Sequence, residues 1–355
     1  MNRAGRLARH SAVAAHLGAL SDRKLATWLE GTAPTGSGIG GTTATLGVDG
    51  VPVFVKKVPL TDLERRPAHV RSTVNLFQLP TFYQYGIGSA GFGAWRELAA
   101  HLVTTRWVLE NRSQGFPLLH HWRVLPQPPR PSTDSAAEVD QAVAFWEQSP
   151  AVRARLEAIA GCSASLVLFS EHIPHNVQTW LSAQAAVGGT AAASAYAMVE
   201  RDLATGTACM NSRGMLHFDA HFENLLTDGD RIYFADFGLA LYDRFDLTLT
   251  ESAFYRQHVT YDRCYTVTHL TRWLVSKLTG LDPAGCDAFL QDLTNGQRLA
   301  DLPAPAAEIV ARHARTAVVM TRFFRDLQTK SRYTPYPVKE LLQTGAANDR
   351  AGSPN

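Results

Sequence analysis

The chain lacks a long hydrophobic run and an excess of charge of one sign. No stretch approaches the roughly 20 consecutive apolar residues that a helix needs to span a bilayer, so we expect no membrane association. The 355 residues include 34 Lys and Arg and 32 Asp and Glu, which gives a net charge of only +2. Because nucleic-acid binding depends on a basic surface, this balance does not support a nucleic-acid partner.

Closely spaced cysteines are also missing. The four cysteines lie far apart, and none forms a CxxC pair. Neither a zinc site nor a disulfide framework is therefore expected, and a reducing compartment, the cytoplasm, fits best. In residues 1–30, Arg, His and Lys interrupt every short apolar run. This pattern predicts an amphipathic helical extension rather than a signal peptide.

What the chain does contain is a 45% share of hydrophobic residues, which suits a folded core in two lobes. Segments rich in β-branched residues come first and helical patterns later. This order predicts an α+β fold with a small β-rich lobe, a larger mainly helical lobe and a cleft between them. We place the first lobe at 31–170, the second at 171–342 and a flexible tail at 343–355. Residues 139–160 are expected to form one helix.

A glycine-rich stretch precedes the first predicted hairpin. Gly36, Gly38 and Gly41 fit the spacing G-x-G-x-x-G. An Asp49-Gly50 turn follows between two β-rich segments and predicts a hairpin. Because a hairpin rather than a helix comes next, the stretch does not indicate a dinucleotide-binding fold. A glycine-rich turn between strands can instead place its backbone N–H groups over phosphates.

Lys56 lies in the alternating segment VFVKK, in which one of the two lysines must point inward. A buried ammonium without an anionic partner is unfavourable, so phosphate or a carboxylate should lie beside it. We favour Glu97, which lies on a segment with helical periodicity. The alternative, Glu64, is nearer in the sequence, but Pro59 and Pro67 bracket it and leave little room for a helix.

The segment LHFDAHFENLL places Asp219 and Asn224 close together between apolar residues. Asp236 follows in YFADFG, and a turn at residues 228–230 (Asp-Gly-Asp) would return it beside Asn224. Carboxylate and amide oxygens are the ligands that Mg²⁺ takes in proteins. One carboxylate would then remain to accept a proton from an attacking hydroxyl.

In this order, the motifs resemble those of the protein-kinase-like superfamily over roughly residues 31–245. The Asp-Phe-Gly triplet at 236–238 is similar to protein kinases. The loop before it is similar to the H-G-D-x-H-x-x-N loop of aminoglycoside-type phosphotransferases, and its matching residues are His217, Asp219, His221 and Asn224. The resemblance implies a two-lobed kinase-like fold with ATP in the cleft.

The resemblance also implies a role for each motif residue. Asp219 would be the catalytic base, assisted by Lys56 and Asn224, while Asn224 and Asp236 would bind Mg²⁺. The implied nucleotide-binding residues are Gly36, Gly38, Gly41, Lys56, Glu97 and the backbone of Glu171 and Ile173 in the hinge-like segment FSEHI.

The predicted function is Mg²⁺/ATP-dependent transfer of a phosphoryl group to a hydroxyl. The Asp-Phe-Gly triplet and Glu223 slightly favour Ser or Thr of a protein or peptide as the acceptor. His221 and the absence of an A-P-E sequence suggest the alternative, a small-molecule phosphotransferase of the aminoglycoside or choline type. A third hypothesis is a nucleotide-binding scaffold without activity.

For several neighbouring residues we weigh structural roles against catalytic ones. His217 is expected to bond nearby backbone, while His221 would either contact the transferred phosphate or cap the loop. Phe218 replaces the arginine that reads phosphorylation in protein kinases, so an activation loop ordered by phosphorylation is not expected. The aromatic residues of the Gly-rich stretch 75–93 could grip a substrate, but core packing is the commoner fate of aromatic side chains.

Overall fold

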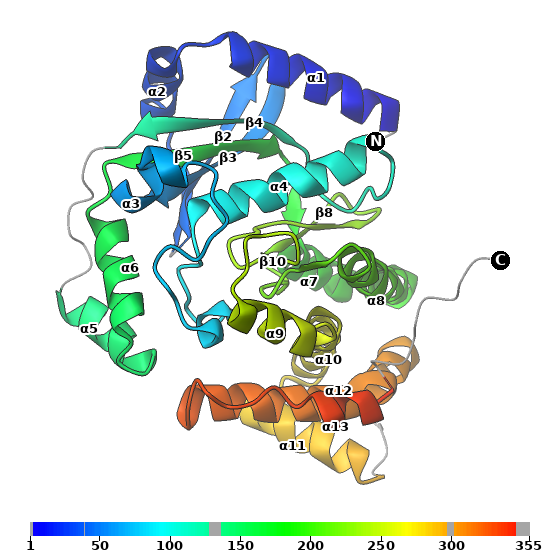
Figure 1. The fold of residues 1–355 in the computed structure, drawn as a ribbon. Coiled ribbons are helices and arrows are strands. Elements are labelled where there is room, and N and C mark those ends of the chain that lie inside the picture. Colours follow the sequence, from blue (N-terminus) through cyan, green and yellow to red (C-terminus); the bar gives the residue numbers. More distant parts are fainter. Residues whose placement is uncertain (1–2, 39, 128–135, 297–301, 346–355) are drawn as a thin grey trace. The chain divides into compact units, whose positions relative to one another are not determined.

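The chain has a mixed α+β fold that divides into two compact units (Figure 1). The described residues of the computed structural model are 3–38, 40–127, 136–296 and 302–345. Unit 1 consists of Met1–Ile173 with Asp236–Thr250, and unit 2 consists of Pro174–Ala235 with Glu251–Asn355. Within the described ranges, no helix combines the length and the apolar character needed to cross a membrane.

Unit 1 is built on a five-stranded antiparallel sheet with the strand order β1-β2-β3-β5-β4. Its strands are β1 (Pro34–Gly38), β2 (Gly41–Val48), β3 (Val51–Leu60), β4 (Leu119–Pro126) and β5 (Ala164–Glu171). Its helices are α1 (Arg3–Ala19), α2 (Asp22–Glu30), α3 (Asp62–Arg65), α4 (Ala94–Leu109), α5 (Ala136–Phe145) and α6 (Pro150–Ala160). Short 3-10 turns occupy Pro67–His69 and Thr81–Gln84, and the short strand β10 covers Leu241–Tyr242.

The two faces of this sheet are covered by different helices, which Figure 1 shows as α1 and α2 on one face and α4 on the other. Val53 and Val55 of β3 pack in the cluster that includes α1 and α2. Val58 packs in the cluster with α4. Because alternate residues of a strand point to opposite faces, Lys56 lies on the same face as Val58, toward α4.

The turns explain how the strands connect. Val48 pairs with Val51 across Asp49 and Gly50, whose φ angles are 48° and 78°, so the predicted Asp-Gly hairpin is confirmed. Gly38 pairs with Gly41 where β1 turns into β2. Gly36 and Gly38 therefore belong to a strand rather than to an irregular loop. Ile39, between the last two glycines of the motif, lies outside the described residues.

The prediction of one helix over residues 139–160 was wrong. Two helices, α5 and α6, occupy this stretch. The side chain of Ser149 accepts a hydrogen bond from Val152 N, and Pro150 follows at the first position of α6. A serine cap followed by proline begins a new helix, because the fixed φ of proline suits the first turn and its missing N–H costs nothing there. The same kind of cap, at Ser21, divides the N-terminal extension into α1 and α2.

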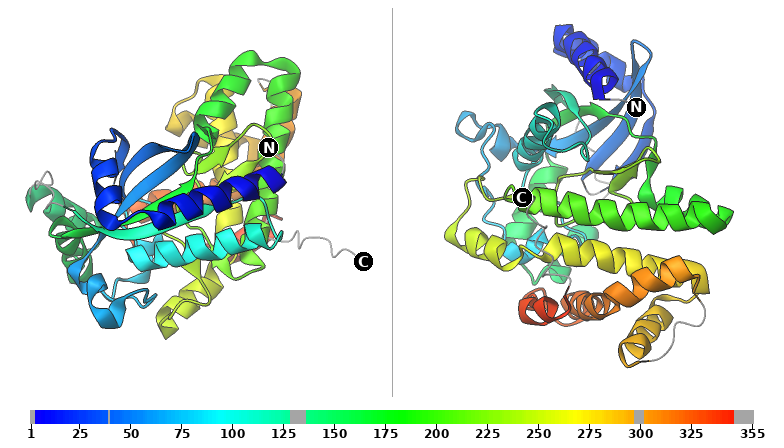
Figure 2. Two further views of the ribbon diagram at one scale, coloured as in Figure 1. Left: turned by 90° about the horizontal axis from the view of Figure 1, so that it is seen from above. Right: turned by 90° about the vertical axis from the view of Figure 1, so that its right-hand side faces the viewer.

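Unit 2 is mainly helical. Its helices are α7 (Val177–Val187), α8 (Gly189–Asn211), α10 (Tyr261–Thr279), α11 (Pro283–Thr294), α12 (Ala304–Thr329) and α13 (Val338–Gln343), and most of α9 (Leu249–Gln257) belongs to it as well. Its short strands are β6 (His175–Asn176), β7 (Met215–Leu216), β8 (Leu225–Thr227) and β9 (Ile232–Phe234). The long helices α8 and α10 pack side by side (Figure 2), and β6, β8 and β9 form a small antiparallel sheet. Of the predicted tail, residues 346–355 lie outside the described part of the chain.

Candidate functional site

The ammonium group of Lys56 lies between two carboxylates of unit 1. Its Nζ is 2.8 Å from Glu97 Oε1 and 2.7 Å from Asp236 Oδ1. The side chains of Lys56 and Glu97 are 8% and 4% exposed, whereas that of Asp236 is 39% exposed. The predicted pairing of Lys56 with Glu97 is thus confirmed, and Asp236 joins the pair from a distant part of the sequence.

Burial alone would lower the pKa of Lys56, but the neighbouring carboxylates of Asp236 and Glu97 outweigh it and raise that pKa. The lysine therefore stays a cation at neutral pH. Burial raises the pKa of Glu97, and the Lys56 ammonium opposes this rise. The Lys56 ammonium is thus a buried cation that two carboxylates hold in place, and Asp236 is the more exposed of the two.

Glu64, the alternative partner, is engaged elsewhere. Its carboxylate accepts hydrogen bonds from Arg155 Nη1 at 2.9 Å and from the backbone N–H of Ala94 at 2.7 Å. It also completes a capping box with Thr61 at the start of α3, which is only four residues long. Glu64 therefore anchors the N-terminus of α4 to α6 and contributes no charge to the Lys56 pair.

The glycine-rich turn lies next to the Lys56 ammonium. A Cβ built on Gly40 would be 3.3 Å from Lys56 Nζ, so the backbone of this glycine closely approaches the charged group. Gly41 has a φ of +130°, and a Cβ there would be 2.1 Å from the carbonyl oxygen of Lys57. Gly41 requires glycine because of its positive φ and the neighbouring carbonyl, whereas at Gly40 the close neighbour is the flexible end of the Lys56 side chain. Glycine N–H groups and a lysine ammonium near one another are typical of a phosphate-binding site.

The Gly- and aromatic-rich stretch 75–93 packs against the segment that follows Asp236. A Cβ on Gly91, whose φ is +72°, would be 2.5 Å from Gly238 O. The side-chain amide of Gln84 donates a hydrogen bond to Leu239 O. Phe82 and Tyr83 are buried, which confirms the prediction of core packing. This stretch therefore braces the chain directly after Asp236.

A second set of contacts continues this brace. Thr73 Oγ1 donates to Asp246 Oδ2 at 2.8 Å and accepts from the Asp246 N–H at 2.9 Å. Arg96 Nε donates to Thr73 O at 2.6 Å, and its guanidinium lies over the ring of Phe245. The segment 236–246 is thus held by contacts with Thr73 and Arg96 within unit 1.

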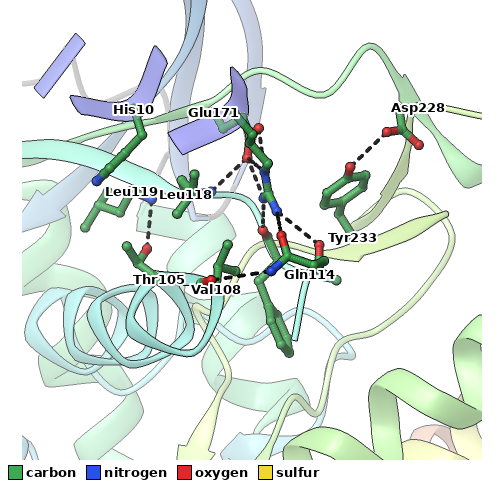
Figure 3. A network of polar contacts seen from close by, with 12 residues as sticks. His10, Thr105, Val108, Gln114, Leu118, Leu119, Glu171, Asp228 and Tyr233 are labelled. Atoms are coloured by element: carbon green, nitrogen blue, oxygen red, sulfur yellow. Dashed lines mark hydrogen bonds and ion pairs between the residues drawn. The ribbon is translucent and has the colours of Figure 1, made fainter. Parts of the chain in front are cut away.

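The hinge-like segment at the end of β5 is held by its own polar network (Figure 3). The backbone N–H of Glu171 donates to Leu118 O at 2.8 Å, so this N–H is already engaged within unit 1. The Glu171 carboxylate accepts from Arg6 and from the Leu118 N–H. It therefore serves the local structure, while Ile173 follows at the last position of this part of unit 1.

In unit 2, the loop after β7 brings Asp219 and Asn224 together. Asn224 Nδ2 donates to both the backbone carbonyl and the Oδ2 of Asp219, each at 3.0 Å. Both acceptors are oxygens, which fixes the orientation of the amide and directs its oxygen toward another partner. The Asp219 side chain is 22% exposed, so its carboxylate remains partly accessible to solvent.

His221 lies beside this pair. Its Nε2 is 3.8 Å from Asp219 Oδ1, and its Nδ1 accepts a hydrogen bond from the Glu223 N–H at 3.3 Å. The second contact is the loop cap that was one of the two predicted roles. A contact of Nε2 with phosphate stays a prediction.

No sequence pattern pointed to one residue that shapes this loop, Asp262 at the start of α10. Its buried carboxylate accepts from the backbone N–H of His217 at 2.5 Å and of Phe218 at 2.8 Å. Phe218 has a φ of 64°, a strained conformation for a bulky residue. Burial raises the pKa of Asp262 to about 6, although both N–H groups act to lower it. Asp262 therefore holds the loop in the conformation that presents Asp219.

Asp262 was missed because an acidic residue in the first turn of a helix is ordinary in sequence, where it usually interacts with the helix N-terminus. His217, in contrast, behaves as predicted. Its Nε2 lies 2.9 Å from the backbone oxygen of Ala235. The histidine is fully buried and supports the backbone of the loop rather than acting as an acid or base.

The predicted hairpin before Asp236 is confirmed. Strands β8 and β9 pair with Leu225 opposite Phe234, and the Asp228 carboxylate accepts from two backbone N–H groups of the turn. The Ala235 N–H donates to Asn224 O at 3.2 Å, and the chain reaches Asp236 at the next residue.

The donor groups suit a hard divalent cation. Asn224 offers an amide oxygen, and Asp219 and Asp236 offer carboxylates, which are ligands of the kind that Mg²⁺ prefers. In the described part of the chain, no group of three or more His, Cys, Asp or Glu is arranged to hold a metal ion.

Comparison with known proteins gives no identification by similarity: no family model matches this chain, and no curated protein matches it significantly.

Proposed function

We propose that this chain is a Mg²⁺/ATP-dependent phosphotransferase with a kinase-like fold, which transfers the γ-phosphate of ATP to a hydroxyl group. The observation that carries the proposal is the buried Lys56 ammonium between Glu97 and Asp236. Removing charged groups from water can cost more free energy than their mutual attraction returns, so a buried lysine with two carboxylates is a candidate binding group rather than an obvious source of stability.

Unit 1 supplies the groups that would hold ATP. Lys56 and the N–H groups of the glycine-rich turn would contact the phosphates, and Glu97 keeps the lysine in place. The Glu171 carbonyl and the Ile173 N–H would bond the adenine amino group and a ring nitrogen. An acceptor followed by a donor is the complement of that edge of adenine. Mg²⁺, bound to ATP and to Asn224 and Asp236, would neutralise charge that develops on the phosphates.

Unit 2 supplies the group that would act on the acceptor. Asp219 would orient the hydroxyl and accept its proton as the new P–O bond forms and the bond to ADP breaks. Asn224 holds the Asp219 carboxylate through Nδ2, and Asp262 holds the backbone on its other side. The reaction then produces ADP and a phosphorylated acceptor.

The proposed activity needs no phosphorylation of the enzyme. Phe218 occupies the position of a phosphate-reading arginine, and its ring stacks on Tyr261 in a buried aromatic cluster. The segment after Asp236 is already held by the stretch 75–93 through Gln84 and Gly91. These contacts support an enzyme whose nucleotide site is formed as soon as the chain folds.

A Ser or Thr of a protein or peptide is the acceptor that we favour, on the Asp-Phe-Gly triplet and Glu223. The loop cap made by His221 supports the second candidate, a small-molecule hydroxyl, because protein kinases place a lysine there. The test is transfer of labelled γ-phosphate by the wild type and by Asp219→Asn to a Ser/Thr peptide library and to aminoglycosides and amino alcohols.

Transfer to peptides that is lost in Asp219→Asn supports the protein-kinase form of the proposal. Transfer to small molecules alone assigns the other acceptor class. If ATP binds but the variant and the wild type transfer equally little phosphate to every acceptor, the chain is a nucleotide-binding scaffold and the proposed catalysis is wrong.

A further inference from the structure

A buried arginine of the N-terminal helix holds the end of β5, at the residue to which the proposed function gives an adenine contact. The Arg6 side chain is only 4% exposed. Its Nε donates to the two carboxylate oxygens of Glu171 at 2.8 and 2.9 Å, and its Nη2 donates to Oε2 at 2.6 Å. Such a planar two-pronged contact fixes direction as well as distance, which a lysine cannot do.

The rest of the guanidinium bonds a second chain segment, the one that leads into β4. Nη1 donates to the backbone and side-chain oxygens of Gln114, each at 3.2 Å. Nη2 also donates to the carbonyl of Phe116. Arg6 therefore ties α1 to two strand ends at once, and Figure 3 shows these bonds converging beside Glu171 and Gln114.

Glu171 passes this restraint to the backbone. Its Oε2 accepts from the Leu118 N–H at 3.1 Å, and its own N–H donates to Leu118 O at 2.8 Å. The last residue of β5 is thus fixed through both its side chain and its backbone. Without Arg6, the carboxylate would be left buried with one neutral donor, and it would turn toward water.

Helix α1 is itself anchored near the same place. His10 Nδ1 lies 3.0 Å from His120 Nδ1, and Arg3 Nη2 donates to Leu109 O at 2.9 Å. Because these contacts flank Arg6 along the helix, the guanidinium is held at a fixed position relative to the sheet. The N-terminal extension is consequently part of the structure that positions Glu171.

We propose that Arg6 is a positioning residue for nucleotide binding: through Glu171 it fixes the backbone at 171–173 and so sets the affinity for the adenine ring. This inference rests on the proposed function. Arg6 does not touch the nucleotide. Arg6 instead holds in place the backbone that contacts the nucleotide. Less conformational entropy is then lost when the nucleotide binds, and a pre-formed site gains affinity in this way.

The test compares Arg6→Met and the milder Arg6→Lys with Arg9→Met, a matched control because Arg9 is exposed on the same helix. Hydrogen exchange of the Leu118 and Glu171 amides, measured without ligand, reports directly whether Arg6 holds the end of β5. Calorimetry then gives the dissociation constants of Mg²⁺–ATP and of Mg²⁺–tripolyphosphate, which lacks adenine. We expect faster exchange and about tenfold weaker ATP binding in the Arg6 variants. Tripolyphosphate should bind these variants and the control equally.

Unchanged amide exchange rates in both Arg6 variants would show that Arg6 does not hold the end of β5. Equal weakening of ATP and tripolyphosphate would overturn the adenine assignment, since a general loss of structure affects both ligands alike. If Arg6→Met does not fold, Arg6→Lys carries the comparison. A wild type that binds neither ligand contradicts the proposed function itself, while the exchange measurement still decides whether Arg6 holds the strand end.

Discussion

The two groups of charged residues in this protein are held in opposite ways. In unit 1, Lys56 is buried and fixed by direct ion pairs with Glu97 and Asp236. In unit 2, Asp219 is partly exposed and is fixed by hydrogen bonds to Asn224 and, through the neighbouring backbone, by Asp262. The first arrangement holds a buried cation in a fixed position between two carboxylates. The second leaves a carboxylate partly exposed to solvent.

Under the proposed function, unit 1 would bind the nucleotide and unit 2 would act on the acceptor, so mutations in the two units should have different consequences. A change around Lys56 should affect both the fold and the binding of phosphates, because the charges there compensate one another. A change at Asp219 should leave the fold and ATP binding intact and remove the reaction. The following predictions test this division.

The largest effect is expected for Asp219→Asn. An amide cannot accept the proton of the acceptor hydroxyl, so kcat should fall by about 10²–10⁴-fold. The dissociation constant of Mg²⁺–ATP should stay within about twofold, because binding is assigned mainly to unit 1. The measurement is steady-state transfer to the acceptor found by the labelled-phosphate assay, alongside calorimetry. Asp230→Asn, at an exposed carboxylate of the β8–β9 turn, is the control; a similar loss of rate there would contradict the role given to Asp219.

The next effect is expected for Lys56→Met, which leaves Glu97 and Asp236 without their cation. Removing one partner of a buried ion pair costs about 3–5 kcal/mol, so the free energy of unfolding should fall by about that amount. ATP binding should be lost under conditions in which the variant is still folded. Lys57→Met is the matched control, since Lys57 is adjacent on β3 and points to the other face. If the two substitutions lower the free energy of unfolding equally in denaturant, the ion pairs of Lys56 do not contribute the expected stability.

Asp262→Asn tests how unit 2 holds its loop. Burial raises the pKa of Asp262 from its usual value to about 6. The folded state therefore binds the proton more tightly than the unfolded state, and the stability from this group is fully present below about pH 4 and lost by about pH 6. Relative to Asp262→Asn, the wild type should lose about 3 kcal/mol of unfolding free energy as the pH rises through this window. Urea unfolding at several pH values measures it, and parallel curves for the two proteins would show that Asp262 does not titrate there.

The smallest effect is expected for Gly91→Ala, which tests the brace on the segment after Asp236. Its Cβ would be 2.5 Å from Gly238 O, so the segment must shift, at a cost of about 1–3 kcal/mol. Binding of Mg²⁺–ATP should weaken with it. Gly88→Ala is the control, because Gly88 also has a positive φ but no atom lies within 4 Å of its Cβ. If both substitutions change thermal unfolding and ATP affinity equally, only backbone strain is involved and the contact with Gly238 is unimportant.

Local patterns were sufficient to predict the parts of the fold that depend on neighbours in sequence. The Asp49-Gly50 hairpin, the turn between β8 and β9 and the inward direction of Lys56 all follow from turn chemistry and strand alternation. Glu97 was also predictable, because Glu64 lies between prolines and little helix can form there. The division of 139–160 into two helices could have been predicted from Ser149 and Pro150.

Other features depend on contacts that the sequence does not encode locally. Gly91 looks like any loop glycine until Gly238 is found against it. In the sequence, Asp262 is an ordinary acidic residue at the start of a helix; only the structure shows that its carboxylate accepts a hydrogen bond from the His217 N–H. Arg6 looks like one of several basic residues on an amphipathic helix, and only its burial against Glu171 distinguishes it from Arg9. Such residues become visible only when distant segments come together.

The most direct test of the account is calorimetric titration of the wild type and of Lys56→Met with ATP, in the presence of Mg²⁺ and again with the metal chelated. We expect the wild type to bind ATP and Mg²⁺ to tighten this binding. Lys56→Met should lose ATP binding, while Lys57→Met should keep it. A folded wild type that binds no ATP, or one whose ATP binding is unchanged in Lys56→Met, would contradict the claim that the buried lysine and its two carboxylates form a nucleotide site.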